Sequence, residues 1–158
     1  MEWLPILRWL HVIGACVLLG TGAGIAFFMV MAHRIGDARV IAHTARVVVI
    51  ADFIFTASAV ILQPITGVLL AMLIGWRLTE GWLLLSLILY VVTGAFWLPV
   101  VWIQHRLQKL AQQSVKAGAD LPPEYYKLHR IWFACGFPAF FSVLAIVWLM
   151  TNRPVFAL

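Results

Sequence analysis

One histidine of the sequence lies where an imidazole could bind a metal inside an apolar environment. His11 is near the start of residues 9–33, a stretch without Asp, Glu, Lys or Arg. At about 1.5 Å of rise per residue, it lies roughly 10 Å from the middle of a helix over residues 4–33. A b-type haem needs an imidazole in an apolar slot between helices, where small residues such as Gly14 leave room for the macrocycle. We therefore predict that His11 is a metal ligand and that Gly14 lines a haem site. The alternative is a core histidine that bonds Tyr90 or a backbone carbonyl.

The sequence offers His11 no second histidine at the same depth. The other four histidines lie near the opposite ends of the uncharged stretches, and we expect them to be solvated: His33, His43, His105 and His129. The second ligand of a haem would then be water, Met72 or Met150. Small residues continue the face of His11 at helical spacing and would line the slot: Gly14, Ala15, Leu18, Gly22 and Ala26.

Two further uncharged stretches, residues 53–76 and 81–105, each carry polar residues on one helical face. The first face begins with Asp52, directly before its stretch, and continues with Thr56, Ala59, Gln63 and Gly67. The second face consists of Ser86, Tyr90, Thr93, Trp97, Val101 and Gln104. Polar residues are costly inside a membrane and usually face the interior of a helix bundle. The outer group, which we predict to bind the cofactor together with His11, consists of Gln63, Gly67 and Tyr90. The inner group, which we predict to handle protons, consists of Asp52, Trp97 and Gln104. Packing between helices is the alternative for both faces.

Asp52 directly precedes an uncharged stretch and follows Arg46 by six residues. Two roles fit a carboxylate there. It could form an ion pair with a basic side chain, namely Arg46, Arg106 or Arg130, or it could relay a proton or contact a substrate.

The helices that position these residues follow from the uncharged stretches 9–33, 53–76, 81–105 and 131–152, which together hold 96 of the 158 residues. The chain is 64% apolar with a mean hydropathy of +1.00, whereas soluble domains are roughly 45–50% apolar. A helix needs about 20 apolar residues to cross a bilayer. This composition excludes a soluble enzyme, a disordered chain and a disulfide-stapled secreted domain. We read Cys16 and Cys135 as unpaired thiols.

These stretches predict an all-α protein, a single domain over residues 1–158 that forms an integral membrane four-helix up-down bundle. The helices are expected over about 4–33, 39–75, 82–113 and 124–151, with residues 114–123 as the one clear loop. Short connections make neighbouring helices antiparallel. The second and third helices exceed the membrane thickness, and we expect them to extend into the cytoplasm.

The charges predict which side of the membrane each loop faces. Eight basic residues lie between the first and second stretches or between the third and fourth: Arg34, Arg39, Arg46, Arg106, Lys109, Lys116, Lys127 and Arg130. The positive-inside rule then places both basic loops in the cytoplasm and both termini outside. Since this rule accounts for the net charge of +5, we expect no nucleic-acid partner.

Several short motifs resemble a known family. They are Leu10-His11-Val12, Gly20-Thr21-Gly22, Ala51-Asp52, Phe55-Thr56, Gln63-Pro64, Thr66-Gly67, Ser86-Leu87, Leu89-Tyr90, Trp97-Leu98-Pro99-Val100 and Pro138-Ala139-Phe140. Over nearly the whole chain, this set resembles a bacterial family catalogued as domain of unknown function 2269. Its members are described as predicted integral membrane proteins, which implies a location in the bacterial inner membrane.

The chain is more distantly similar to the copper-resistance-D membrane proteins and the HemJ-type protoporphyrinogen oxidases, which share four-helix units and a Leu-His start. The HemJ-type resemblance implies haem b with a first-helix histidine ligand, here His11. Their third-helix lysine has no counterpart in residues 81–105, so we do not expect porphyrinogen oxidation.

The leading prediction is a membrane protein that binds haem b and transfers electrons, with quinone or a respiratory complex as its exchange partner. The sequence assigns no catalytic residue and leaves oligomerisation open. A non-catalytic accessory or assembly subunit of a larger membrane complex fits the same interior. Transport of copper or a small solute is the third possibility, since Met29 and His33 are soft ligands on one helical face.

Overall fold

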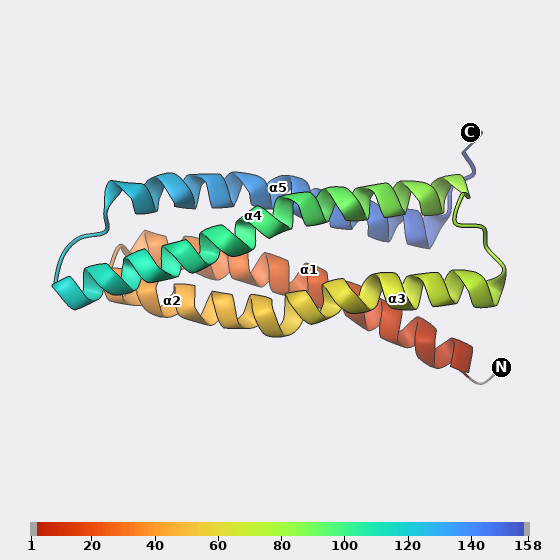
Figure 1. Ribbon diagram of the computed structural model, residues 1–158, viewed down its shortest axis with the longest axis horizontal. Helices are drawn as coiled ribbons and strands as arrows, with labels where there is room; N and C mark the ends of the chain where they lie inside the picture. The colour runs from red at the N-terminus through yellow and green to blue at the C-terminus, as the bar shows by residue number, and fades with distance from the viewer. Residues whose placement is uncertain (1–2, 157–158) are drawn as a thin grey trace.

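The computed structural model describes residues 3–156, which form helices and short connections and contain no strand. The elements are α1 (Trp3–Ile35), α2 (Ala38–Ala51), the π-helical turn η1 (Asp52–Thr56), α3 (Ala57–Ile74), α4 (Gly81–Ala117) and α5 (Pro123–Asn152). Because α2, η1 and α3 run on without a break, the chain forms four long helical rods, drawn in Figure 1. Each of the four is long and apolar enough to cross a membrane. The predicted all-helical membrane bundle is confirmed.

The helix boundaries lie close to the expected ones except at the end of α4. The third helix was expected to end near residue 113, but it continues to Ala117. The loop before α5 is therefore only residues 118–122. Gly118 ends the helix with a left-handed φ of +61°, a conformation that costs glycine little. Residues 114–117 contain no such breaker, so they stay helical.

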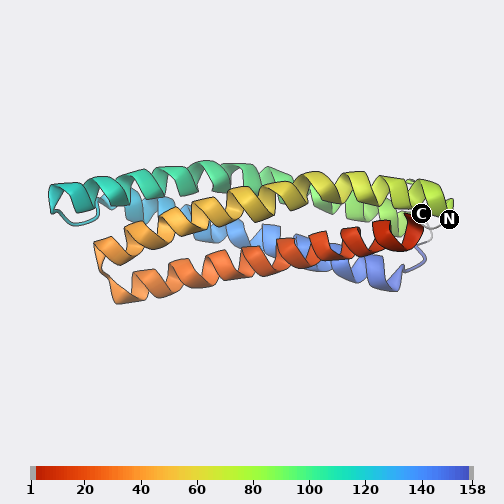
Figure 2. The ribbon, with the colours of Figure 1, turned by 90° about the horizontal axis from the view of Figure 1, so that it is seen from below.

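The rods alternate in direction and leave both termini at one end of an elongated bundle (Figures 1 and 2). We call this the terminal end, and it also holds the connection between α3 and α4. The opposite end, which we call the basic end, holds the α1–α2 turn and the α4–α5 loop. At the basic end, Asp37 caps α2 by accepting a hydrogen bond of 2.7 Å from the backbone N–H of Arg39.

Two clusters of buried apolar residues hold the rods together. The larger lies toward the basic end and joins α1, α2, α4 and α5, with Met29, Ile41, Leu107, Tyr125 and Trp132 among its members. The smaller lies at the terminal end and consists of Ala71, Trp82, Leu83 and Leu149. Between these clusters, residues 15–24 of α1 and 87–99 of α4 include no buried residue. Lipid can cover such surfaces, because apolar side chains lose nothing by facing lipid tails.

Candidate functional site

The structure joins α1 to α3 through one polar cluster, the His11 cluster, which consists of His11, Gly14, Gln63, Thr66 and Gly67. His11 Nδ1 lies 2.8 Å from Thr66 Oγ1. The Thr66 hydroxyl has a single proton, which it donates to the carbonyl of Leu62 at 2.8 Å. With that proton on Leu62, Thr66 accepts from His11 and the imidazole is assigned as the Nδ1–H tautomer. The lone pair of the ring is then on Nε2, which has no hydrogen-bond partner in residues 3–156.

Two glycines allow the close approach of α1 and α3 in this cluster. A Cβ on Gly67 would lie 3.1 Å from His11 Cε1, and a Cβ on Gly14 would lie 2.9 Å from Gln63 Nε2. Gln63 in turn donates a hydrogen bond of 2.9 Å from Nε2 to the backbone carbonyl of His11. The side chains of one helix thus fill the space beside the glycine of the other.

Replacing Gly67 with alanine is expected to weaken the association of α1 with α3. The added methyl group presses on an imidazole that Thr66 already holds, and such overpacking typically costs about 1–3 kcal/mol. The free energy of unfolding of the detergent-solubilised protein measures this cost. Gly22→Ala is the matched control, because a Cβ at Gly22 meets nothing within 4 Å. Equal stability of the two variants would show that the contact at Gly67 is not tight.

Tyr90, predicted to bind the cofactor together with His11, forms no hydrogen bond to the His11 cluster. Its hydroxyl donates to the backbone carbonyl of Val60. Pro64 lies four residues after Val60 within α3 and has no N–H, so it leaves this carbonyl without its helical donor. Tyr90 therefore supplies a missing backbone hydrogen bond, which membrane helices need wherever proline removes one. Ser86 bonds its own helix, at the carbonyl of Trp82.

The expected slot lined by small residues is also absent near His11. Gly14 and Gly67 are occupied by Gln63 and His11, while Gly22 is exposed and has nothing within 4 Å. Met72 is 71% exposed, which excludes it as a second ligand directed into the bundle. Met150 packs against the terminal-end cluster.

A second polar group, the Asp52 network, links α4 to η1 and α5. It consists of Asp52, Trp97, Gln104 and Trp132. The Gln104 amide is taken in the orientation that gives hydrogen-bond partners to both its nitrogen and its oxygen. The amide nitrogen then donates to Asp52 Oδ2 at 3.2 Å, and the amide oxygen accepts from Trp132 Nε1 at 3.2 Å. Trp97 Nε1 donates to Asp52 Oδ1 at a longer 3.4 Å. The network brings together Trp132 and the three residues predicted as the inner group.

Asp52 is 5% exposed, and no salt bridge reaches it within the described residues. The ion pairs expected with Arg46, Arg106 or Arg130 are therefore not formed; Arg106 instead pairs with Glu124 at 2.9 Å. One turn beyond Asp52, the buried Thr56 Oγ1 has no hydrogen-bond partner. Both residues belong to η1, and single π-helical turns are frequent at functional sites. The Asp52 carboxyl group thus has neutral N–H donors beside it and no salt bridge.

Replacing Asp52 with leucine is expected to lower the free energy of unfolding by about 2–4 kcal/mol. The change leaves one buried N–H of Gln104 without an acceptor, at about 1–3 kcal/mol, and the half-buried indole N–H of Trp97 without one, at about 1 kcal/mol. Asp52→Asn should cost less, because the new amide keeps one acceptor oxygen. Replacement of the exposed Asp37 by asparagine, which keeps a capping oxygen, serves as the control. If Asp52→Leu were as stable as the native chain, the network would contribute nothing.

The structure contains a third group that the sequence-based reasoning missed. His33 and His129 are half-buried and stack with their ring centroids 3.7 Å apart, so the expectation that these two histidines are solvated is wrong. His33 Nδ1 lies 2.6 Å from the carbonyl of Met29, which can only accept. His33 Nε2 therefore accepts from the hydroxyl of Tyr125, at 2.9 Å. We call His33, Tyr125 and His129 the histidine stack.

A signal for this stack exists in the sequence. Tyr125 and His129 are four residues apart on one helix, as are Met29 and His33 on another, so each pair shares a helical face. His129 also stacks on Trp132 of the Asp52 network, with ring centroids 5.8 Å apart. His43 and His105 are exposed, as expected.

Of the two soft ligands of the copper alternative, His33 has no free lone pair in this arrangement. Both ring nitrogens of His33 are engaged, by Met29 and Tyr125. Among residues 3–156, no group of three His, Cys, Asp or Glu side chains could hold a metal. The unpaired state predicted for Cys16 and Cys135 is confirmed, since both are free thiols.

Comparison with known proteins agrees with the membrane architecture. Residues 5–154 match the family described as predicted integral membrane protein, DUF2269. No curated protein and no solved structure matches the chain. The similarity to copper-resistance-D and HemJ-type proteins thus stays a prediction. Because the family match spans nearly the whole chain, this protein belongs to the DUF2269 family of integral membrane proteins.

Proposed function

We propose that this protein binds a b-type haem through His11 and transfers electrons within the membrane. The observation that carries the proposal is the state of the His11 imidazole. Its Nδ1 lies 2.8 Å from Thr66 Oγ1, and Nε2 has no hydrogen-bond partner among residues 3–156, so the assigned Nδ1–H tautomer leaves a lone pair on Nε2. Histidines that bind metals nearly always donate their other ring N–H to a fixed acceptor, which orients the ring.

The residues around His11 supply one imidazole ligand but no slot for the macrocycle, because Gln63 and His11 fill the space beside Gly14 and Gly67. Thr66 fixes the tautomer, and Gly67 lets the imidazole lie against α3. Gln63 holds the backbone of the histidine at its carbonyl. A bound haem would supply one-electron chemistry, and the protein tunes it through the axial ligand and that ligand's hydrogen bonds. A lipid-soluble quinone or a respiratory complex is the proposed exchange partner.

We assign proton handling to the inner group of Asp52, Trp97 and Gln104. The buried carboxylate has no cationic partner among residues 3–156, so its protonation would not have to break an ion pair. Asp52 precedes Gln63 by 11 residues, about 16 Å along a helix axis. The proposed redox group and the proton-handling group are therefore separate.

An absorption spectrum of the purified protein tests the haem proposal. The protein is expressed with haem supply and purified in mild detergent, and its spectrum is recorded before and after reduction by dithionite. We expect a Soret band that shifts on reduction, and about one haem per chain on extraction into pyridine. Protein that carries no haem, even after incubation with haemin, would overturn the proposal. Stable co-purification with a membrane oxidase or dehydrogenase would then favour the accessory-subunit function.

We further propose that the basic end faces the cytoplasm of the bacterial inner membrane and that both termini lie outside. Two variants test this orientation, Lys116→Cys and Arg153→Cys. Each is made in a chain whose native Cys16 and Cys135 have been replaced by alanine. In intact spheroplasts a membrane-impermeant maleimide should label the cysteine at position 153 and spare the one at position 116. The reverse pattern would contradict the orientation, and lysed membranes provide the control for full reactivity.

A further inference from the structure

A basic depression on the outer face of α4 lies beyond the His11 cluster and the Asp52 network. It is lined by Trp102, His105, Arg106 and Lys109 and has a volume of about 240 Å³. These four residues follow i, i+3, i+4 and i+7 and so share one helical face. The depression begins at the last turn of the uncharged stretch 81–105 and ends beyond it. It therefore lies where the hydrocarbon of a bilayer gives way to the headgroups.

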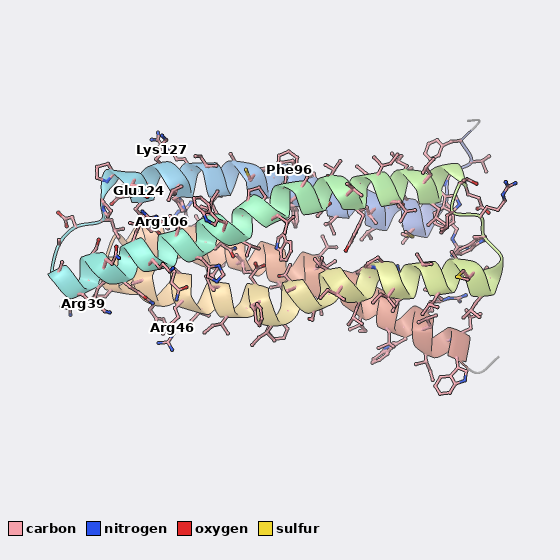
Figure 3. All side chains as sticks on the ribbon, in the orientation of Figure 1. Arg39, Arg46, Phe96, Arg106, Glu124 and Lys127 are labelled. Carbon is pink, nitrogen blue, oxygen red and sulfur yellow. The ribbon has the colours of Figure 1, made fainter. Side chains whose placement is uncertain are left out.

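The cations of this depression are available to an anion. Glu124 Oε1 accepts from Arg106 Nε at 3.0 Å and from Nη2 at 2.9 Å. Figure 3 labels both residues where α4 passes α5. This pair uses two of the five N–H donors of a guanidinium and fixes its orientation, leaving three donors free. Lys109 has no salt bridge in the described residues. His105 Nδ1 donates to the carbonyl of Val101 at 2.9 Å, so Nε2 of the neutral ring is an acceptor and the donors to an anion come from Arg106 and Lys109. The depression thus has two positive charges, on Arg106 and Lys109, and only one negative charge beside them, on Glu124.

The same helix face continues into the membrane as an exposed apolar strip. Val91 is 69% exposed, and Leu98 and Trp102 are each 64% exposed. They precede Arg106 and Lys109 at helical spacing, so one ligand along α4 would meet apolar side chains first, an indole next and cations last. Tryptophan prefers the boundary between acyl chains and headgroups. A soluble anion or a nucleic acid would contact the cations alone and would not use the apolar strip.

We infer that this face of α4 binds an anionic phospholipid, with its phosphate at Arg106 and Lys109, its glycerol beside Trp102 and an acyl chain along Leu98 and Val91. Basic pockets at the ends of membrane helices are suited to such headgroups. This inference does not depend on the proposed haem.

Native mass spectrometry of the purified full chain in neutral detergent tests the site. The chain is titrated with phosphatidylglycerol, with zwitterionic phosphatidylcholine and with inorganic phosphate. We expect binding of phosphatidylglycerol in preference to phosphatidylcholine, and no displacement by phosphate at equal concentration. Equal binding of the two lipids would overturn the inference. Displacement by phosphate would also overturn it, in favour of a soluble anion.

Charge-matched variants locate the site. Arg106→Gln combined with Lys109→Gln should weaken phosphatidylglycerol binding about 25-fold, from the usual contribution of a basic residue near a membrane surface. The control combines Arg39→Gln with Lys127→Gln; both are exposed at the same end, and Lys127 points away from α4 in Figure 3. Unchanged binding by the first variant, or an equal loss in the control, would overturn the site. The preference of the native chain between the two lipids remains a test if the variant does not fold.

Discussion

Replacement of His11 by alanine is expected to abolish the haem absorption of the purified protein. No other histidine lies in the His11 cluster: His33 and His129 belong to the histidine stack, and His43 and His105 are exposed. Loss of Nε2 therefore removes the one imidazole proposed to bind the iron. The Soret absorbance per protein and the haem extracted into pyridine measure the loss, which should exceed tenfold.

Three further variants separate ligation from folding. His11→Gln keeps a polar side chain of similar reach against Gly67 and should also lose haem while retaining its helical circular dichroism. Thr66→Val keeps the volume and removes the acceptor of Nδ1–H, so haem should remain bound with a raised midpoint potential, since the ligand becomes less basic. His43→Ala, at an exposed position, is the control. Haem retained in both His11 variants would contradict this role.

Replacement of Tyr125 by alanine should cause the largest loss of stability. Tyr125 has 0% exposure and belongs to the larger apolar cluster at the basic end. Removing a buried aromatic ring typically costs about 3–5 kcal/mol. The same change also takes away the hydroxyl that donates to His33 Nε2, so α1 and α5 lose packing and a hydrogen bond together. Equilibrium unfolding of the detergent-solubilised protein by sodium dodecyl sulfate measures the effect.

The neighbouring residue supplies a matched control for Tyr125. Tyr126 is 50% exposed, so Tyr126→Ala should change the free energy of unfolding little. Tyr125→Phe keeps the ring and should cost only the hydrogen bond, about 0.5–1.5 kcal/mol. Similar losses for the two alanine variants would show that the histidine stack does not stabilise the bundle.

The helical periodicity of the sequence predicted correctly which polar residues share a face of the second rod, because this depends on one helix alone. Asp52, Thr56 and Gln63 are buried on one face of the second rod, because the 3.6-residue repeat determines which side chains share a side. Periodicity cannot determine which residue of another helix lies opposite. Tyr90 was therefore assigned to His11, whereas it bonds the carbonyl of Val60 that Pro64 leaves free.

Asp52 shows that the sequence also does not determine which charged or polar group of another helix lies beside a buried carboxyl group. Its sequence neighbour Arg46 suggested an ion pair, but the rotation and depth of the rods bring Gln104 and Trp97 to the carboxylate instead. The two histidines of the stack come from α1 and α5, 96 residues apart. Helix-to-helix docking, which no local pattern records, decides both contacts.

The sequence by itself determined that this is a four-helix membrane protein, since the length of an uncharged apolar stretch is a local property and the bilayer selects it. It also determined which residues share a helical face and that the basic residues gather at one end. Only the tertiary structure decided that Thr66 orients His11, that neutral donors lie beside Asp52 and that His33 and His129 stack. These contacts depend on how the helices cross and how closely glycines let them approach, which is a property of the whole bundle and not of any one helix.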